Sequence, residues 1–193
     1  MLTSIPPWNV QGVIDPIDFA NPPSAIRSPY IVSLETVVRH FSTSPERIQI
    51  LDGLLRYRDA LHTAGIEQGF QWLNGSFLEN KEQNQGAPPN DIDVLTLFVP
   101  PSGISLNELF ARDPVIFGRA RNAVKAKFLV DGFLVQFGQN PTSLMENACY
   151  FFSLFSHKKT TYQWKGILQV DLSSGEDAAA NAAMPSLLGG ATP

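Results

Sequence analysis

The chain has 193 residues, a formal net charge of −4, 44% hydrophobic residues and 17% charged residues. This length suits one domain with extensions, and the composition is typical of a folded chain and excludes a disordered one. The acidic balance argues against a general polyanion-binding surface, because duplex nucleic acid is held largely by lysine and arginine. The one cysteine, Cys149, cannot form an internal disulfide, and a zinc site would lack thiolate partners.

The ends of the chain differ in composition from its middle. The sequence begins MLTSIPPWNV, which lacks the basic and apolar regions of a secretory signal, and no apolar run approaches the roughly 20 residues that span a bilayer. We therefore expect a cytoplasmic protein without a membrane partner. Residues 1–30 are rich in proline and predict an arm packed across a domain at 31–172. Residues 173–193 are mostly small and predict a disordered or loosely attached tail.

The first strongly predicted element is a helix. Ser44 is a good N-cap, Pro45 suits the first helical position, and Gly65 suits the C-terminal cap. Four side chains recur at helical spacing and should form the buried face: Ile50, Leu54, Tyr57 and Leu61. Three arginines lie mostly on the other faces and are expected to be solvated: Arg47, Arg56 and Arg58.

Strands and helices alternate through the rest of the domain. Four apolar or β-branched stretches predict strands: residues 70–73, 91–99, 127–138 and 162–172. The polar residues 79–90 predict a loop. Two stretches predict helices: 105–126, in one or two pieces with Asp113-Pro114 opening the second, and 142–156, capped by Thr142 or Ser143 with Glu146. Gly132 is a candidate for a β-bulge. Strands separated by helices indicate an α/β or α+β layer architecture.

Three aspartates are the candidate metal ligands and catalytic residues. Asp91 and Asp93 are two positions apart in a strand, so their side chains point to the same face with Cα atoms roughly 6.6 Å apart. Two carboxylates held this close need a cation, and Mg²⁺ (or Mn²⁺) binds one or two protein carboxylates together with substrate phosphates. Asp131 interrupts an apolar run, where burial without a partner is costly, and would complete a two-metal arrangement.

A glycine-serine turn is the candidate phosphate site. Gly75 lets the backbone turn tightly and approach a ligand, and the exposed amides with the Ser76 hydroxyl can bind the phosphates of a nucleoside triphosphate. Lys81 lies in the following loop and is either a point charge for a phosphate or a solvated lysine. Lys165, which begins the last predicted strand, is a candidate neighbour of the site. Lys158 is expected to complement the end of the preceding helix, with binding of an acidic acceptor as the alternative.

The order of these motifs resembles that of a known superfamily. WLNGSF, DIDV, VDGFLV and WKGILQVDL, after a proline-rich arm and the RIQILDGLLRYRDAL helix, resemble small uncharacterised bacterial proteins of the nucleotidyltransferase superfamily with the polymerase-β-like fold. The resemblance covers roughly residues 5 to 172. It implies a small mixed sheet with helices mainly on one face. It also implies that Gly75 and Ser76 form the phosphate turn, that Asp91 and Asp93 are the paired ligands, and that Asp131 is the third carboxylate.

Two features depart from that family's pattern. The loop between the turn and the paired aspartates is long and rich in Asn and Gln, and Gly132 follows Asp131 where an apolar residue is usual. The expected activity is transfer of a nucleoside monophosphate from a triphosphate such as ATP to a hydroxyl on a protein, RNA or small molecule. The alternative is a catalytically silent binding protein with a protein partner, such as part of a toxin-antitoxin or phage-defence system, which rests on analogy alone.

Overall fold

The computed structural model, which describes residues 4–118 and 121–188, has a mixed α+β architecture built on one sheet. The five strands run in the order β1-β5-β2-β3-β4. Their bounds are β1 Tyr30–Ile31, β2 Gly69–Asn74, β3 Ile92–Phe98, β4 Val130–Gln136 and β5 Leu168–Asp171. β2 is antiparallel to both neighbours, whereas β3 is parallel to β4 and β1 is parallel to β5. The predicted fold class is confirmed.

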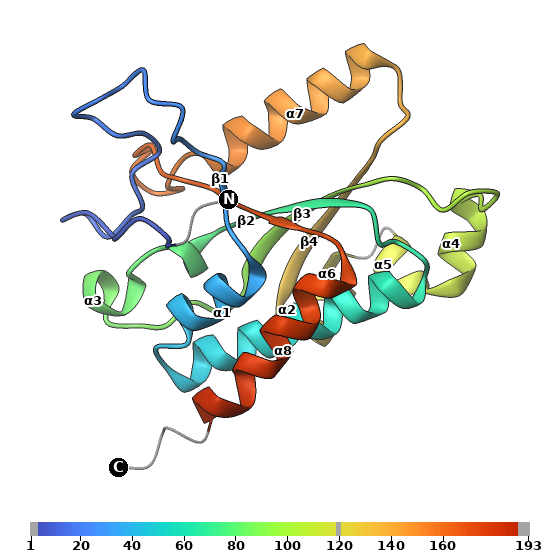
Figure 1. The fold of residues 1–193 in the computed structure, drawn as a ribbon, viewed down its shortest axis with the longest axis horizontal. Coiled ribbons are helices and arrows are strands. Elements are labelled where there is room, and N and C mark those ends of the chain that lie inside the picture. The colour runs from blue at the N-terminus through green and yellow to red at the C-terminus, as the bar shows by residue number, and fades with distance from the viewer. Residues whose placement is uncertain (1–3, 119–120, 189–193) are drawn as a thin grey trace.

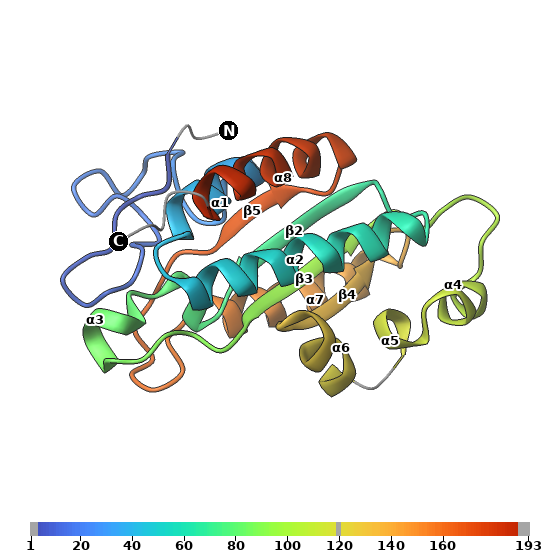
Figure 2. The ribbon, with the colours of Figure 1, turned by 90° about the horizontal axis from the view of Figure 1, so that it is seen from below.

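Helices cover the two faces of the sheet unequally. The helices, with one 3-10 turn, are α1 Leu34–Phe41, α2 Pro45–Thr63, η1 Ser76–Leu78, α3 Lys81–Gln85, α4 Leu106–Arg112, α5 Pro114–Phe117, α6 Arg121–Phe128, α7 Pro141–Phe155 and α8 Ser174–Leu188. α1, α2, α6 and α8 lie across one face (Figure 2), whereas α7 lies on the other (Figure 1). No helix in the described ranges combines the length and apolarity needed to cross a membrane.

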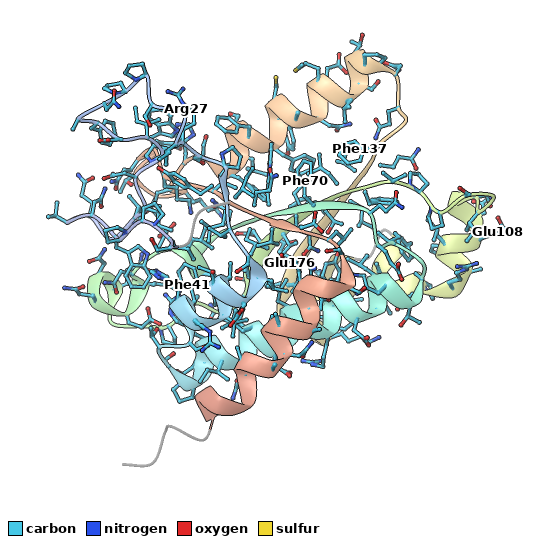
Figure 3. The ribbon with its side chains drawn as sticks, in the orientation of Figure 1. Arg27, Phe41, Phe70, Glu108, Phe137 and Glu176 are labelled. Carbon is cyan, nitrogen blue, oxygen red and sulfur yellow. The ribbon has the colours of Figure 1, made fainter. Side chains whose placement is uncertain are left out.

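Each face of the sheet has its own apolar core. The larger core joins the sheet to α1, α2, α6 and α8, and it contains the four predicted side chains of α2, all fully or almost fully buried: Ile50, Leu54, Tyr57 and Leu61. The smaller core lies under α7 and includes Trp72, Leu95 and Phe155. Phe70 and Phe137, labelled in Figure 3, pack together beside it with ring centroids 5.8 Å apart.

Two arginines of α2 are buried, which corrects the expectation that they are solvated. Arg47 and Arg58 are both 0% exposed, whereas Arg56 is exposed as predicted. The Arg58 guanidinium donates to Asp177 at 2.6 Å and to Gln71 at 2.7 Å. A buried charge is tolerated when it is paired and hydrogen-bonded, and these partners satisfy that condition.

The C-terminal segment is a packed helix, so the expectation of a disordered or loosely attached tail is wrong for α8. Three of its side chains enter the larger core: Ala180, Ala183 and Met184. Glu176 accepts a hydrogen bond from the Leu34 amide at 2.7 Å and so caps α1, while Asp177 binds Arg58 (Figure 3 labels Glu176). Alanine-rich helices bury little apolar area, but these polar contacts fix α8 against its neighbours. Residues 189–193 lie outside the described part of the chain.

The N-terminal arm packs against the domain through hydrogen bonds and apolar anchors. Ile5 and Ile14 are buried, and the Trp8 indole donates to the Leu78 carbonyl at 2.7 Å. The Gly12 carbonyl accepts from the Asn80 amide at 2.9 Å. The arm therefore reaches the segment that follows the glycine-serine turn.

Several local predictions need smaller corrections. The expected loop at 79–90 contains α3, and the expected helix at 105–126 is divided into α4, α5 and α6, with Asp113 capping α5 as predicted. α7 is capped by Asn140 rather than by Thr142 or Ser143. Gly132 pairs regularly with Val94 and is not a bulge, and a side chain there would meet the Tyr57 hydroxyl.

Candidate functional site

The three predicted aspartates lie at the N-terminal ends of two neighbouring strands, β3 and β4. Asp93 is the second residue of β3, Asp131 is the second residue of β4, and the two are directly paired in the parallel register. Adjacent strands are about 4.8 Å apart, so these residues are immediate neighbours. Asp91 immediately precedes β3. All three side chains are partly buried.

Side-chain alternation places the carboxylates of Asp93 and Asp131 on the face that α7 covers. Leu95 follows Asp93 by two positions and Phe133 follows Asp131 by two, and both apolar residues contact the core under α7. The carboxylates therefore lie where this apolar core ends. α2 and its neighbours pack on the opposite face.

Negative charge concentrates on Asp93. Burial first, and then the neighbouring carboxylates of Asp91 and Asp131, together raise the pKa of Asp93 to about 6, against the opposing ammonium groups of Lys165 and Lys125. Lys125 binds the Asp91 carboxylate at 2.5 Å. This hydrogen bond to Asp91 raises the pKa of Lys125. The raised pKa of Asp93 therefore reflects its burial first, and second the two neighbouring carboxylates.

Gly75 lies directly against the Asp93 carboxylate. Its backbone has φ 82° and ψ −168°, a conformation essentially restricted to glycine. A Cβ atom at this position would lie 2.2 Å from Oδ2 of Asp93. The predicted turn and the predicted carboxylate pair are thus in contact, through a residue that tolerates no side chain. The Gly75 amide already donates to the Asn74 side chain at 2.6 Å. Ser76 is therefore the residue of the turn that could donate a hydrogen bond to the phosphate of a ligand.

A buried lysine links the turn to a further carboxylate. Lys165 is 4% exposed, and its ammonium donates to the Gly75 carbonyl at 3.0 Å and to Glu79 at 2.7 Å. Burial lowers the pKa of Lys165, while Glu79 and Asp93 act in the opposite direction. The sequence indicated Lys165 through its place before a strand, but nothing in the polar segment after Ser76 distinguished Glu79 from its neighbours.

Arg47 supports the same turn from the opposite side. Its guanidinium donates to the carbonyls of Phe77 and Glu79 at 2.6 and 2.7 Å, and it forms an ion pair with Glu82. The hydrogen bond from Arg47 lowers the pKa of Glu82. The backbone that follows Ser76 is therefore fixed by a buried cation.

Two other predicted lysines make contacts that the sequence did not indicate. Lys81 lies at the start of α3, where its ammonium donates to the Pro88 carbonyl at 3.1 Å. That contact does not carry it to the aspartates. Lys158 lies 3.7 Å from Glu79 and so faces the turn rather than simply complementing the end of α7.

The donor set suits a divalent cation, although a complete ligand cluster is not formed. Among the described residues, no three His, Cys, Asp or Glu side chains converge as a metal-binding group. Carboxylate oxygens are the ligands that Mg²⁺ prefers, and the excess charge at Asp93 is the condition that a cation would relieve. Binding through Asp91 would require its carboxylate to exchange Lys125 for the metal.

Comparison with known proteins gives a family but no activity. Residues 6–171 match the model of DUF6932, a family of unknown function. This match includes residues 6–30 of the arm, the five strands and the candidate site, and it ends before α8. No curated protein and no solved structure matches the chain.

Proposed function

The chain belongs to the DUF6932 family, whose function is unknown, and we propose from the chemistry of its site that it is a Mg²⁺-dependent nucleotidyltransferase. It would move a nucleoside monophosphate from a nucleoside triphosphate to a hydroxyl acceptor. One observation carries the proposal: the Asp93 carboxylate lies against Gly75 of the turn and is also close enough to Asp91 and Asp131 to feel their charge. The carboxylates that would bind a cation therefore lie next to the glycine turn that would bind phosphates.

Each residue would have a distinct task in that reaction. Asp91 and Asp93 would hold the cation, and the Ser76 hydroxyl would donate a hydrogen bond to the triphosphate. Mg²⁺, when bound, supplies positive charge to the phosphates and to the departing pyrophosphate. Asp131 would orient the acceptor hydroxyl and accept its proton as the acceptor oxygen bonds to the α-phosphorus and the bond to pyrophosphate breaks. Lys165 would hold the turn in position through the Gly75 carbonyl.

A second candidate is a binding protein that keeps the fold without turnover. The ion pair between Lys125 and Asp91 favours this alternative, because a lysine already neutralises one of the two proposed ligands. In such a protein the turn would bind a nucleotide while the carboxylates stay paired with lysine. Release of pyrophosphate separates the two functions, since only the transferase produces it.

The proposal is tested by an activity assay with a matched carboxylate control. The protein is incubated with Mg²⁺ and each α-labelled nucleoside triphosphate, and label transfer and pyrophosphate release are measured. Asp93→Ala should reduce both by at least about 100-fold, because it removes a ligand of the cation. Asp52→Ala changes an exposed carboxylate of α2 and should retain wild-type activity.

Two results would count against this function. Transfer at the wild-type rate by Asp93→Ala would show that the activity lies elsewhere. Nucleotide binding with no pyrophosphate released over a long incubation would favour the binding protein.

A further inference from the structure

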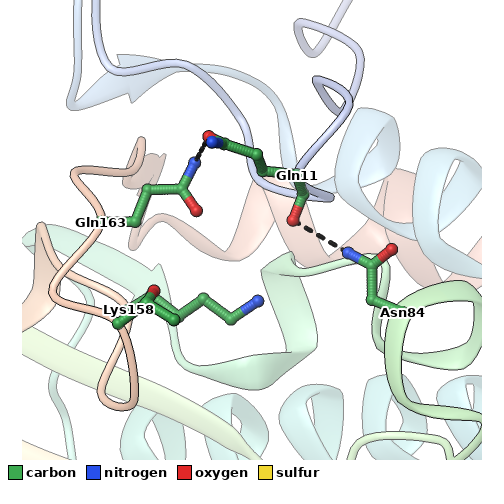
Figure 4. A pocket seen from close by; sticks show the side chains of 5 residues that line it. Gln11, Asn84, Lys158 and Gln163 are labelled. Atoms are coloured by element: carbon green, nitrogen blue, oxygen red, sulfur yellow. Dashed lines mark hydrogen bonds between the residues drawn. The ribbon is translucent and has the colours of Figure 1, made fainter.

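A cavity beside the candidate site is formed by three separate parts of the chain. Its volume is about 510 Å³, within the range of roughly 300–1,000 Å³ for small-molecule sites. Five polar side chains line it: Gln11 of the arm, Asn84 of α3, and Lys158, Thr161 and Gln163 of the segment after α7. Figure 4 shows Lys158 extending toward the space that Gln11, Gln163 and Asn84 bound.

Hydrogen bonds hold this cavity open in a defined shape. The Asn84 amide donates to the Gln11 carbonyl at 2.8 Å, and the Gln163 amide donates to the Gln11 side-chain oxygen (Figure 4). The Lys158 backbone amide donates to the Gln163 carbonyl at 2.8 Å, which closes the segment after α7 into a tight loop. The arm therefore contributes a wall of the cavity rather than only covering the domain.

The charge in this cavity is positive, in a chain whose net charge is −4. None of the five lining side chains is acidic. The ammonium of Lys158 lies 3.7 Å from one oxygen of Glu79, whereas the other oxygen of Glu79 is 2.7 Å from Lys165. Two ammonium groups thus share one carboxylate, with the closer contact made by Lys165. Since the Lys158 side chain is only 12% exposed, water solvates it poorly, and an anion in the cavity would complete its neutralisation.

We propose that this cavity binds the phosphate group of a small phosphorylated ligand. Lysine is a common phosphate ligand and acts as a compact point charge. The Thr161 hydroxyl and the side-chain amides of Asn84 and Gln163 line the same cavity as Lys158, and Asn84 belongs to a different segment, which suits an anion that accepts several hydrogen bonds. The binding requires neither a metal ion nor turnover, so it does not depend on the transferase activity.

The phosphate can come from two sources. A chain of contacts leads from Lys158 through Glu79 and Lys165 to Gly75, so the cavity lies close enough to the turn to receive the tail of a nucleoside triphosphate. The other source is a separate phosphorylated molecule. Both place the same group against Lys158.

An NMR titration with inorganic phosphate, without metal or nucleotide, tests the inference. Phosphate should shift the backbone amide resonances of Asn84, Thr161 and Gln163. Lys158→Gln should weaken binding about tenfold, the effect of losing one charge-assisted hydrogen bond. Lys159→Gln removes the exposed neighbouring charge and should bind as the wild type does.

Other results overturn it. Shifts confined to other regions, no saturable shift, or equal weakening by the two glutamine variants would each exclude a phosphate site here. Lys158→Arg controls for damage to the fold, since it keeps the charge and should keep the binding. Competition between phosphate and Mg²⁺ with α,β-methylene-ATP would identify the cavity as the site of a nucleotide tail, whereas simultaneous binding would identify a separate ligand. If the nucleotide does not bind at all, the proposed function fails while the phosphate result stands.

Discussion

Replacing Asp93 by asparagine should stabilise the protein, and the gain should depend on pH. The folded protein raises the pKa of Asp93 from 3.8 to about 6, mainly by burial and then by the charges of Asp91 and Asp131. The folded state therefore binds its proton more tightly than the unfolded state does. Stability is greatest below the unfolded pKa and falls as pH rises through the folded pKa. Asparagine carries no ionisable group and so avoids this loss.

The magnitude follows from the size of the pKa shift. The shift from 3.8 to about 6 is roughly two units, which corresponds to about 3 kcal/mol at most. The difference in unfolding free energy between Asp93→Asn and the wild type should therefore increase by about 2–3 kcal/mol from about pH 4 to about pH 7.5, almost all of it by pH 6.5. Below about pH 3 Asp93 is protonated in both the folded and the unfolded wild-type protein, so the difference should be constant there.

Urea denaturation across this pH range, in the presence of a metal chelator, measures the effect. Asp52→Asn is the matched control, because Asp52 is an exposed carboxylate and its replacement should give a nearly pH-independent difference. Adding Mg²⁺ at neutral pH should narrow the gap by stabilising only the wild type, if the cation binds there. A difference between Asp93→Asn and the wild type that does not change with pH would refute the raised pKa of Asp93 in the folded protein.

Two further substitutions test other parts of the structure. Asp177→Ala should lower the unfolding free energy by about 3 kcal/mol, because it removes the carboxylate that pairs with the buried Arg58 guanidinium. Asp52→Ala, at an exposed carboxylate, should lower it by less than about 1 kcal/mol. Equal effects of the two substitutions in denaturant titrations would contradict the packing of α8. Gly75→Ala should cost more than Gly86→Ala, for which only backbone strain of about 1–2 kcal/mol applies, because a Cβ at Gly75 would displace the Asp93 carboxylate. Loss of Mg²⁺-dependent nucleotide binding should accompany the first of these glycine substitutions and not the second.

Local signals predicted the elements that depend on local interactions. Ser44 and Pro45 begin α2 as their capping chemistry requires, and the buried stripe of α2 follows from helical spacing. The resemblance in motif order placed Asp131 with the aspartate pair, but only the register of β3 and β4 makes Asp131 the direct partner of Asp93 on the same face of the sheet. For this reason the candidate carboxylates are neighbours although 38 positions separate them in the sequence.

Buried charges whose partners are distant in the sequence could not be predicted in the same way. Arg47 and Arg58 were expected on the surface, because a charged side chain is buried only where partners exist. The Phe77 carbonyl that accepts from Arg47 lies 30 positions away, and the Asp177 carboxylate that binds Arg58 lies 119 positions away. The role of Glu79 could not be predicted for the same reason, because it depends on an ion pair with Lys165, which is 86 positions away in the sequence. α8 was predicted as a tail because its alanines bury little area, and only the contacts of Glu176 and Asp177 reveal why it docks.

The pairing of Arg58 with Asp177 also sets an order of events for the growing polypeptide. These two residues are 119 positions apart, so a ribosome makes the guanidinium long before its carboxylate. Until α8 emerges, burying Arg58 beside Gln71 would leave its charge without a counter-ion, at a cost of about 3–5 kcal/mol. An expression fragment trimmed to residues 6–171 would retain every strand yet lack this counter-ion, and it would reproduce that unfinished nascent state rather than the mature domain.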